Sequence, residues 1–258
     1  MNNPHQIIFT AIEGIPVIKS GDDLARIIYS KCIDQHLQIT DGDIFVLAQK
    51  IVSKAEGRLV DLRSVSPGRR ARTIAKKTLK DPRLIELILQ ESKRVLRIRK
   101  GLIIVEHRNG FVCANAGIDH SNSIDGIDAE HFVLLLPENP DISAFRIREQ
   151  LQRLFHINIG VLIIDSHGRA WRNGTVGTSI GISGLPGLVD LRGKSDLFGY
   201  KLKATLVGAA DELAAGASLL MGQASESLPC ILVKGFPYPL RESSLNELIR
   251  SKESDLFR

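Results

Sequence analysis

The residues best suited to chemistry stand where an apolar run ends on a carboxylate. Residues 161–164 are β-branched or leucine, a pattern typical of a strand buried on both faces. Asp165 follows directly, and the next four residues add a hydroxyl, an imidazole, a glycine and a guanidinium. These groups suit an anion and metal site in which Asp165 binds the cation. The open alternative is a turn in which Asp165 accepts backbone hydrogen bonds.

A second carboxylate follows a predicted hairpin. Asn109-Gly110 lies between the apolar runs 102–105 and 111–113, which is a strong hairpin signal. The segment after the hairpin is rich in short oxygen-bearing side chains and contains Asp119. Mg²⁺ and Mn²⁺ take oxygen ligands, often one or two carboxylates together with phosphate and water. Asp119 and Asp165 could form such a pair, unless they belong to two unrelated turns.

Two further segments carry groups suited to a phosphorylated ligand. The predicted strand 43–48 runs into Lys50, Lys54 and Arg58, whose cations could meet phosphates or could lie over the surface. A loop of small residues follows the predicted helix 210–221 and suits contact with a ligand. The two acids in the first turn of that helix are explained by the helix dipole, which favours negative charge there.

The elements that must position these groups follow from hydrophobic periodicity. The pattern predicts strands over residues 6–12, 43–48, 95–98, 102–105, 111–113, 132–136, 161–164, 202–207 and 230–233. It predicts helices from about residue 22, over 66–93 with a break at Asp81-Pro82, over 142–155 and over 210–221. The run 176–187 is rich in glycine, but the chain contains no G-x-G-x-x-G, and residues 187–195 miss the phosphate-loop pattern because five residues, not four, separate Gly187 from Gly193. A bound nucleotide must therefore be held by another scaffold.

Composition limits the class of protein. A chain of 258 residues that is 43% hydrophobic and 24% charged can form one large domain or two small ones. Glu13 and Asp22 interrupt the N-terminal region, so no signal peptide is legible, and we expect a cytoplasmic protein without a membrane span. Cys32, Cys113 and Cys230 are far apart in apolar surroundings, which predicts buried free thiols.

The net charge of +5 favours anionic partners, and much of the excess lies in residues 69–77. These cations could form the solvated face of a helix or a nucleic-acid surface. Only 5% of the residues are aromatic, and no basic stripe is interleaved with rings for stacking bases. We therefore do not expect nucleic acid as a partner.

Eight short blocks occur in order along the chain: GIPVIKSGDD at 14–23, SKAEGR at 53–58, NAGIDHSN at 115–122, DSHGR at 165–169, GISG at 181–184, DLFG at 196–199, ADELA at 210–214 and LLMGQ at 219–223. Together they resemble the signature blocks of the coenzyme F-420-0:L-glutamate ligase family, also called F-420 gamma-glutamyl ligases. The resemblance extends from about residue 8 to 236. It implies one ligase domain over 1–240 that includes the helical layer 66–93, followed by a C-terminal helix or tail over 241–258.

The resemblance implies an α+β fold specific to the family, with mixed, largely antiparallel sheets, flanking helices and an intertwined homodimer. The implied activity is GTP-dependent addition of L-glutamate to the deazaflavin precursor F-420-0 through an acyl phosphate, releasing GDP and phosphate. The resemblance is also compatible with the addition of further γ-linked glutamates. The implied cofactors are Mg²⁺ or Mn²⁺ at two sites, and a monovalent cation is also allowed.

Position by position, the resemblance assigns metal ligation to Asp119, Asp165, Ser166 and Gln223, and catalysis to Lys54, Asp119 and Asp165. The positions that would contact GTP are Ile15, Pro16, Val17, Ile18, Gln49, Lys50, Lys54, Asn122, Met221, Gly222, Gln223, Ala224, Ser225, Glu226, Ser227 and Leu228. Some relatives have glutamate where Gln223 stands, and a neutral amide attracts a divalent cation less. Residues 49 and 50 also differ from the small hydroxyl residues of some relatives. The alternative functions are a ligase of this scaffold with another acceptor or amino acid, and a nucleic-acid-binding protein.

Overall fold

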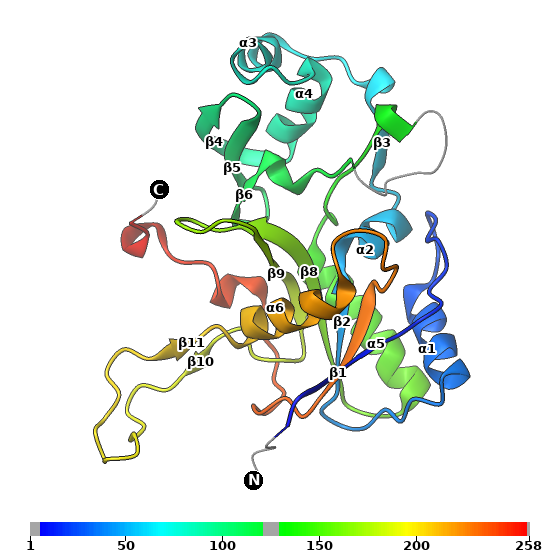
Figure 1. Ribbon diagram of the computed structural model, residues 1–258, viewed down its shortest axis with the longest axis vertical. Coiled ribbons are helices and arrows are strands. Elements are labelled where there is room, and N and C mark those ends of the chain that lie inside the picture. Colours follow the sequence, from blue (N-terminus) through cyan, green and yellow to red (C-terminus); the bar gives the residue numbers. More distant parts are fainter. Residues whose placement is uncertain (1–5, 121–128, 257–258) are drawn as a thin grey trace.

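A computed structural model describes residues 6–120 and 129–256 (Figure 1). Its centre is a five-stranded sheet in the order β1-β12-β2-β8-β9. The strands are β1 (Ile8–Ala11), β2 (Ile44–Ala48), β8 (Gly160–Gly168), β9 (Thr175–Ser183) and β12 (Cys230–Lys234). β2 and β8 are parallel, whereas the other pairs in this sheet are antiparallel.

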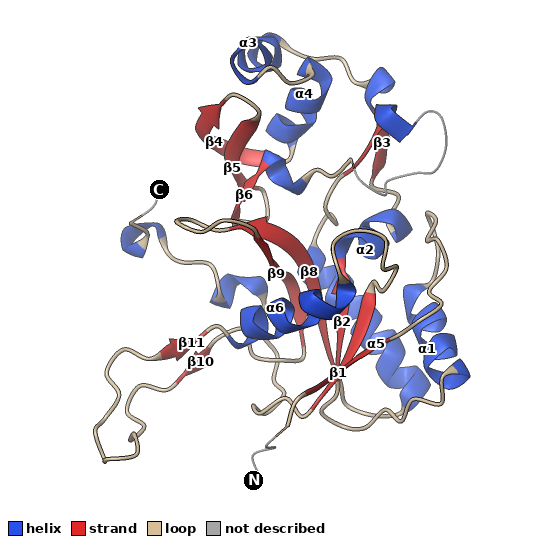
Figure 2. Cartoon of the chain, viewed as in Figure 1, coloured by secondary structure: helices blue, strands red, loops and turns tan. Residues whose placement is uncertain are grey.

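The centre of this sheet is buried on both faces, as the apolar run 161–164 predicts. Val161 and Ile163 pack with α1 (Leu24–Asp34) and α5 (Pro140–Phe155) in one core. Leu162 and Ile164 pack with α6 (Ala209–Met221) in another. Because successive strand side chains point to opposite faces, helices cover both faces of the sheet (Figure 2).

β9 corrects the interpretation of the glycine-rich run, for which no strand was predicted. Its register shifts opposite β8, because Ile163 pairs with Gly181 while Ile164 pairs with Ser179. A Cβ atom on Gly181 would lie 2.4 Å from the carbonyl oxygen of Pro140 at the start of α5. A Cβ atom on Gly177 would lie 2.4 Å from the carbonyl oxygen of Ala214 in α6. These glycines let the two helices pack closely on opposite faces of the sheet.

A smaller lobe stands beside the central sheet and contains the predicted helical layer. Helices α3 (Arg69–Thr78) and α4 (Pro82–Gln90) share a hydrophobic core with β4 (Ser92–Arg99), β5 (Leu102–His107) and β6 (Val112–Ala114). The predicted break at Asp81-Pro82 is confirmed, because Asp81 caps α4 by accepting the backbone N–H of Arg83. The predicted hairpin at Asn109-Gly110 is also confirmed.

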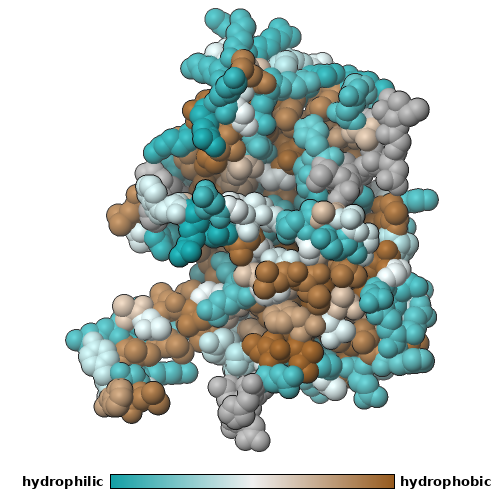
Figure 3. Space-filling model, viewed as in Figure 1, coloured by the Kyte–Doolittle hydropathy of each residue, from teal (hydrophilic) through white to brown (hydrophobic). Residues whose placement is uncertain are grey.

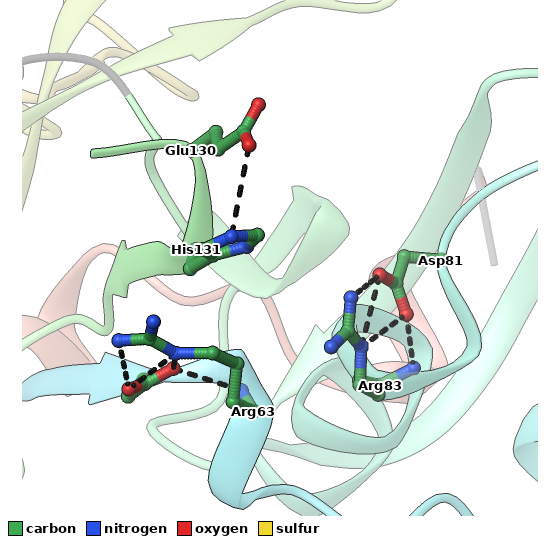
Figure 4. A network of polar contacts seen from close by, with 6 residues as sticks. Arg63, Asp81, Arg83, Glu130 and His131 are labelled. Carbon is green, nitrogen blue, oxygen red and sulfur yellow. Dashed lines mark hydrogen bonds and ion pairs between the residues drawn. The ribbon is translucent and has the colours of Figure 1, made fainter. Parts of the chain in front are cut away.

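Two elements connect the lobe to the central sheet. Helix α2 (Gln49–Ala55) directly follows β2, and β3 (Leu59–Asp61) pairs with β7 (Phe132–Leu134). Figure 4 shows three ion pairs near this connection, Arg63 with Asp61, Arg83 with Asp81, and His131 with Glu130.

One predicted strand differs from the structure. The strand predicted over 202–207 shrinks to β11 (Leu206–Val207), which pairs with β10 (Val189–Asp190) at the base of a projecting arm (Figure 1). The residues between these two short strands project from the molecule, so the alternating pattern of 202–205 does not correspond to a strand in a sheet. Of the two alternatives for the C-terminal segment, a helix or a tail, the structure has a tail with 3₁₀ turns at Leu245–Glu247 and Lys252–Ser254.

Several global expectations are confirmed. The fold is mixed α+β with mostly antiparallel sheets, and the three cysteines are buried free thiols. Within residues 6–120 and 129–256, no helix has the length and hydrophobicity needed to cross a bilayer. The cytoplasmic location, the domain boundaries and the homodimer stay predictions.

Candidate functional site

A cavity of about 610 Å³ lies at the end of the parallel strand pair, where β2 passes into α2. This volume is within the usual range for small-molecule sites. Every predicted site residue that the structure describes lines it: Ile15, Pro16, Val17, Ile18, Gln49, Lys50, Lys54, Asp119, Asp165, Ser166, Met221, Gly222, Gln223, Ala224, Ser225, Glu226, Ser227 and Leu228. The remaining one, Asn122, lies outside the described residues. The cavity thus gathers segments from five parts of the chain, while the roles of the residues stay predictions.

Asp165 reaches the cavity from inside β8. The strand does not end at this residue, as the sequence suggested, but continues to Gly168 in a hairpin with β9. The turn-capping alternative is therefore wrong as well. The parallel pairing with β2 does end at Ile164, so Asp165 is the first β8 residue beyond the end of β2. Its Oδ2 lies 3.0 Å from Nε2 of His167, and its side chain is 15% exposed.

Asp119 reaches the same cavity through an unusual stretch of backbone. Asn115, Ala116 and Gly117 have φ angles of 50°, 56° and 66°, in the left-handed region that costs energy for residues other than glycine. Asp119 is then anchored by two backbone hydrogen bonds with Leu134 at the end of β7. The two carboxylates, remote in sequence, therefore line one cavity and do not belong to unrelated turns.

Helix α2 supplies the cations. Lys50 and Lys54 are four residues apart, hence on one face of the helix, and both line the cavity. Nζ of Lys50 lies 2.8 Å from Oδ2 of Asp119. Arg58 instead points to the lobe, where its Nη2 lies 2.9 Å from Oε1 of Glu91 and its Nε donates to the carbonyl of Leu136. Of the three predicted phosphate-contacting cations, two belong to the cavity and one is structural.

Gln49 is a buried polar residue at the start of α2, and it also lines the cavity. Its Oε1 accepts a hydrogen bond from the hydroxyl of Ser53. Its Nε2 is buried and has no hydrogen-bond partner in the described part of the chain. Because a buried donor without a partner is costly, this amide is a candidate for contact with a ligand.

The loop after α6 closes another side of the cavity. Its Gln223 accepts, through Oε1, a hydrogen bond of 2.8 Å from the hydroxyl of Ser166. The carboxylate of Glu226 accepts the backbone N–H of Ala224, and this hydrogen bond lowers the pKa of Glu226. Gly222 has a φ of 71°, and a Cβ atom there would collide with Glu226. The conformation of the loop therefore depends on Gly222 and on the carboxylate of Glu226.

The donor set fits a hard divalent cation in its chemistry. Asp119, Asp165, Ser166 and Gln223 all offer oxygen atoms to one cavity, and oxygen is what Mg²⁺ and Mn²⁺ prefer. Within residues 6–120 and 129–256, no three His, Cys, Asp or Glu side chains form a metal cluster. Two carboxylates would thus need phosphate oxygens or water to complete the coordination of a cation.

Some features of the site were not predicted. Ile118, Ile164 and Ser218 also line the cavity; the first two adjoin the predicted aspartates, whereas no sequence signal marks Ser218. Cys113 is close behind the site, and burial, with a smaller contribution from the charge of Asp165, raises the pKa of its thiol to about 12. This thiol is therefore no candidate nucleophile.

Other candidate groups have structural roles. The basic residues of α3 are exposed while Ala71, Ile74, Ala75 and Thr78 face the core, so the cations lie on the solvent side of the helix, and the absence of a nucleic-acid partner stays a prediction. Asp211, in the first turn of α6, accepts the backbone N–H of Ser179 beside the register shift of β9. Asp211 therefore has two structural roles, because it holds the strand through this hydrogen bond and also interacts favourably with the helix dipole.

Together, the fold and cavity define an α+β protein in which carboxylates, lysines and a small-residue loop surround one ligand-sized space. The sequence profile of the F420-0:Gamma-glutamyl ligase family matches residues 14–235. Proteins named coenzyme F420:L-glutamate ligase are 43% identical in Methanothermobacter thermautotrophicus, over 98% of this chain and 99% of the relative, and 43% identical in Methanocaldococcus jannaschii, over 95% and 94%. The protein of that name in Archaeoglobus fulgidus is 40% identical over 96% and 94%. The chain belongs to the F420-0:gamma-glutamyl ligase family.

Proposed function

We propose that this protein adds L-glutamate to F420-0 with GTP as the energy source, and that it can add further γ-linked glutamates. The names of its relatives support the acceptor and the amino acid. The observation that carries the proposal is the convergence of Asp119, Asp165, Lys50 and Lys54 on one cavity. Paired carboxylates and cations suit a triphosphate with its divalent cation.

The chemistry requires an activated carboxylate, because a carboxylate and an amine do not condense at neutral pH without a leaving group. The acceptor's carboxylate oxygen attacks the γ-phosphorus of GTP, the bond to the β-phosphate oxygen breaks, and GDP leaves. The glutamate amine then attacks the acyl carbon of the acyl phosphate, loses a proton and displaces inorganic phosphate. Both steps depend on positioning and on neutralising phosphate charge.

The residues of the cavity divide these tasks. Asp119 and Asp165 would hold Mg²⁺ or Mn²⁺, with Ser166 and Gln223 at a second site. The bound cation supplies neutralisation of the triphosphate charge. Lys54, and Lys50 once its contact with Asp119 is exchanged for a phosphate contact, add positive charge beside the γ-phosphate. The apolar residues 15–18 and the loop 221–228 enclose the nucleotide, and a monovalent cation can add to the charge balance.

The direct test is to incubate the purified protein with F420-0, GTP, Mn²⁺ and L-glutamate and to weigh the products by mass spectrometry. We expect the mass of one or more added glutamyl residues, with GDP and phosphate released in equal amounts. Product formed equally well without GTP would contradict the proposed requirement for GTP. A panel of other acceptors and amino acids addresses the second candidate, a ligase of this scaffold with different substrates.

We further propose a homodimer in which the arm between β10 and β11 contacts a second copy. Leu197 is 97% exposed and Phe198 is 94% exposed, and hydrophobic surface gathers along the arm (Figure 3). Large exposed apolar side chains of this kind mark contact surfaces. Light scattering after chromatography should give twice the chain mass, and replacing both residues by serine should halve it. Ile33→Ser, on exposed α1 surface, is the matched control.

A further inference from the structure

We propose that His167 is a positioning residue that orients the Asp165 carboxylate for binding the divalent cation. This inference rests on the proposed function, because it assigns a task in the same cavity. It concerns a residue that the family resemblance did not assign and that does not itself line the cavity.

The geometry starts from strand periodicity. Asp165 and His167 are two residues apart in β8, so their side chains project from the same face of the strand. Nε2 of His167 lies 3.0 Å from Oδ2 of Asp165, and the two side chains are 11% and 15% exposed. Because Asp165 lines the cavity and His167 does not, the imidazole lies behind the carboxylate.

The imidazole atom that faces Asp165 has no competing hydrogen-bond partner among the described residues. Nε2 of His167 is buried, and no hydrogen bond to it occurs within residues 6–120 and 129–256. Its contact with Asp165 has the distance of a hydrogen bond but not its direction, which a small rotation of the Asp165 carboxylate would supply. The cost of leaving a buried polar atom unpaired favours that bond.

The lobe holds the imidazole in place. The ring of Phe111, in the β5–β6 hairpin, lies 5.4 Å from the ring of His167 with an angle of 40° between the planes. Phe111 is itself stacked on His107, with centroids 4.9 Å apart and planes at 6°. Because His107 is fully buried, this row of rings limits the rotation of His167.

The two carboxylates of the cavity are thus held in different ways. Asp119 contacts Lys50, which lines the cavity and can exchange its partner for a phosphate. Asp165 contacts a largely buried ring that does not itself line the cavity. With Oδ2 directed toward His167, Oδ1 is the oxygen that would be available to a cation. Outer partners that orient a metal ligand typically contribute about 10 to 100-fold to metal affinity.

The experiment compares Mn²⁺ affinity, measured by the electron paramagnetic resonance of unbound Mn²⁺, in His167→Leu, His167→Asn and His167→Gln. The leucine and asparagine variants should bind Mn²⁺ about 10 to 100-fold more weakly. His167→Gln, whose amide nitrogen reaches as far as the imidazole Nε2, should recover most of the affinity. In ligase assays, excess Mn²⁺ should restore kcat in the weak variants, which a structural defect would not allow.

A second histidine offers a matched control. Nε2 of His131 lies 3.6 Å from Oε1 of Glu130, and neither residue lines the cavity (Figure 4). His131→Leu removes a histidine–carboxylate contact elsewhere in the molecule, so it should leave Mn²⁺ affinity unchanged. An equal loss in this variant would overturn the inference.

The outcomes separate this inference from the proposed function. If the unsubstituted protein forms no glutamylated product, the proposed function fails, while the Mn²⁺ affinities still decide the role of His167. Equal affinities in the unsubstituted protein and all three His167 variants overturn that role, even if the protein is an active ligase. A directly bound ¹⁴N signal from His167 in the Mn²⁺ pulsed resonance spectrum would also overturn it, because the imidazole would then be a ligand. If His167→Leu fails to fold, as thermal melting would reveal, the asparagine and glutamine pair gives the answer.

Discussion

The cavity and the smaller lobe both contain many charged residues, but these charges lie in different surroundings. Residues 69–100 contain twelve Lys and Arg against three Asp and Glu, in a chain whose net charge is +5. The remainder of the chain is therefore net negative. The cations of α3 point to solvent on the hydrophilic end of the molecule (Figure 3). The cavity holds fewer charges, drawn from distant segments, and places them in partly buried contacts such as that between Lys50 and Asp119.

The difference shows that local charge density is a poor guide to a site. Exposed charges are screened by water and salt within about 10 Å, so a solvated helix face gains little from its cations. Partly buried charges interact more strongly because the effective dielectric constant is lower. Convergence of dispersed residues thus matters more than a run of like charges.

The largest effect should come from the cavity. Asp165→Asn should lower glutamylation by at least about 10³-fold, because under the proposed function it removes a carboxylate that would hold the cation beside the phosphates. The substitution is nearly isosteric, so the melting temperature should change little. Steady-state kinetics and thermal melting check both points. Asp34→Asn, an exposed carboxylate of α1, should retain full activity, and full activity of Asp165→Asn would refute the role.

A lysine from each region tests the comparison directly. Lys50→Met should lower kcat/KM for GTP by about 10 to 100-fold, because under the proposed function it removes a charge that would neutralise phosphate. Lys76→Met, on the exposed face of α3, should leave kcat/KM unchanged at an ionic strength near 0.15 M, where exposed charges are screened. Similar losses in both variants would show that the lobe takes part in catalysis.

Close packing in the central sheet should be more sensitive to substitution than the open end of its β8–β9 hairpin. Gly181→Ala places a methyl group 2.4 Å from a backbone oxygen of α5, which cannot move without shifting the helix. We expect a loss of about 1 to 3 kcal/mol in the free energy of unfolding, measured by denaturant titration. Gly168→Ala, at the end of the partner strand β8 in the same hairpin, meets no atom of the described residues within 4 Å. It should be nearly neutral, and an equal loss there would contradict the packing argument.

The smallest effect near neutral pH concerns His107 at the junction of the two regions. Burial, and then the charges of Arg108 and Arg58, lower the pKa of His107 from 6.5 to about 3. Between these values the unfolded chain binds a proton that the folded chain does not. The free energy of unfolding should therefore fall as the pH drops from 6.5 toward 3, by at most about 1.4 kcal/mol per pH unit.

Denaturant titrations at several pH values check this dependence. His107→Gln removes the imidazole and should flatten the slope below pH 6.5. His36→Asn replaces an exposed histidine whose φ of 52° asparagine tolerates, so it should leave the slope unchanged. If the free energy of unfolding depends on pH equally steeply in His107→Gln, His107 is excluded as the source of the dependence.

Much of the fold could be predicted because its signals are local. The apolar runs 44–48 and 161–164 need two covered faces, Asp81-Pro82 caps a helix, and Asn109-Gly110 permits a tight turn. β9 could not be predicted in this way. Its glycines resemble a loop in sequence, and only the closeness of α5 and α6 explains why this strand has glycine at positions 177 and 181. The continuation of β8 past Asp165 likewise depends on its pairing with β9.

The sequence by itself determined which groups are available for chemistry, the family to which they belong, and the helices and strands set by short-range patterns. Tertiary structure decided which of these groups meet. Asp119 and Asp165 line one cavity, Arg58 turns away to Glu91, and His167 stands behind Asp165. The physical reason is that capping, turns and periodicity act over a few residues, whereas the meeting of distant side chains depends on strand register and helix packing across the whole fold.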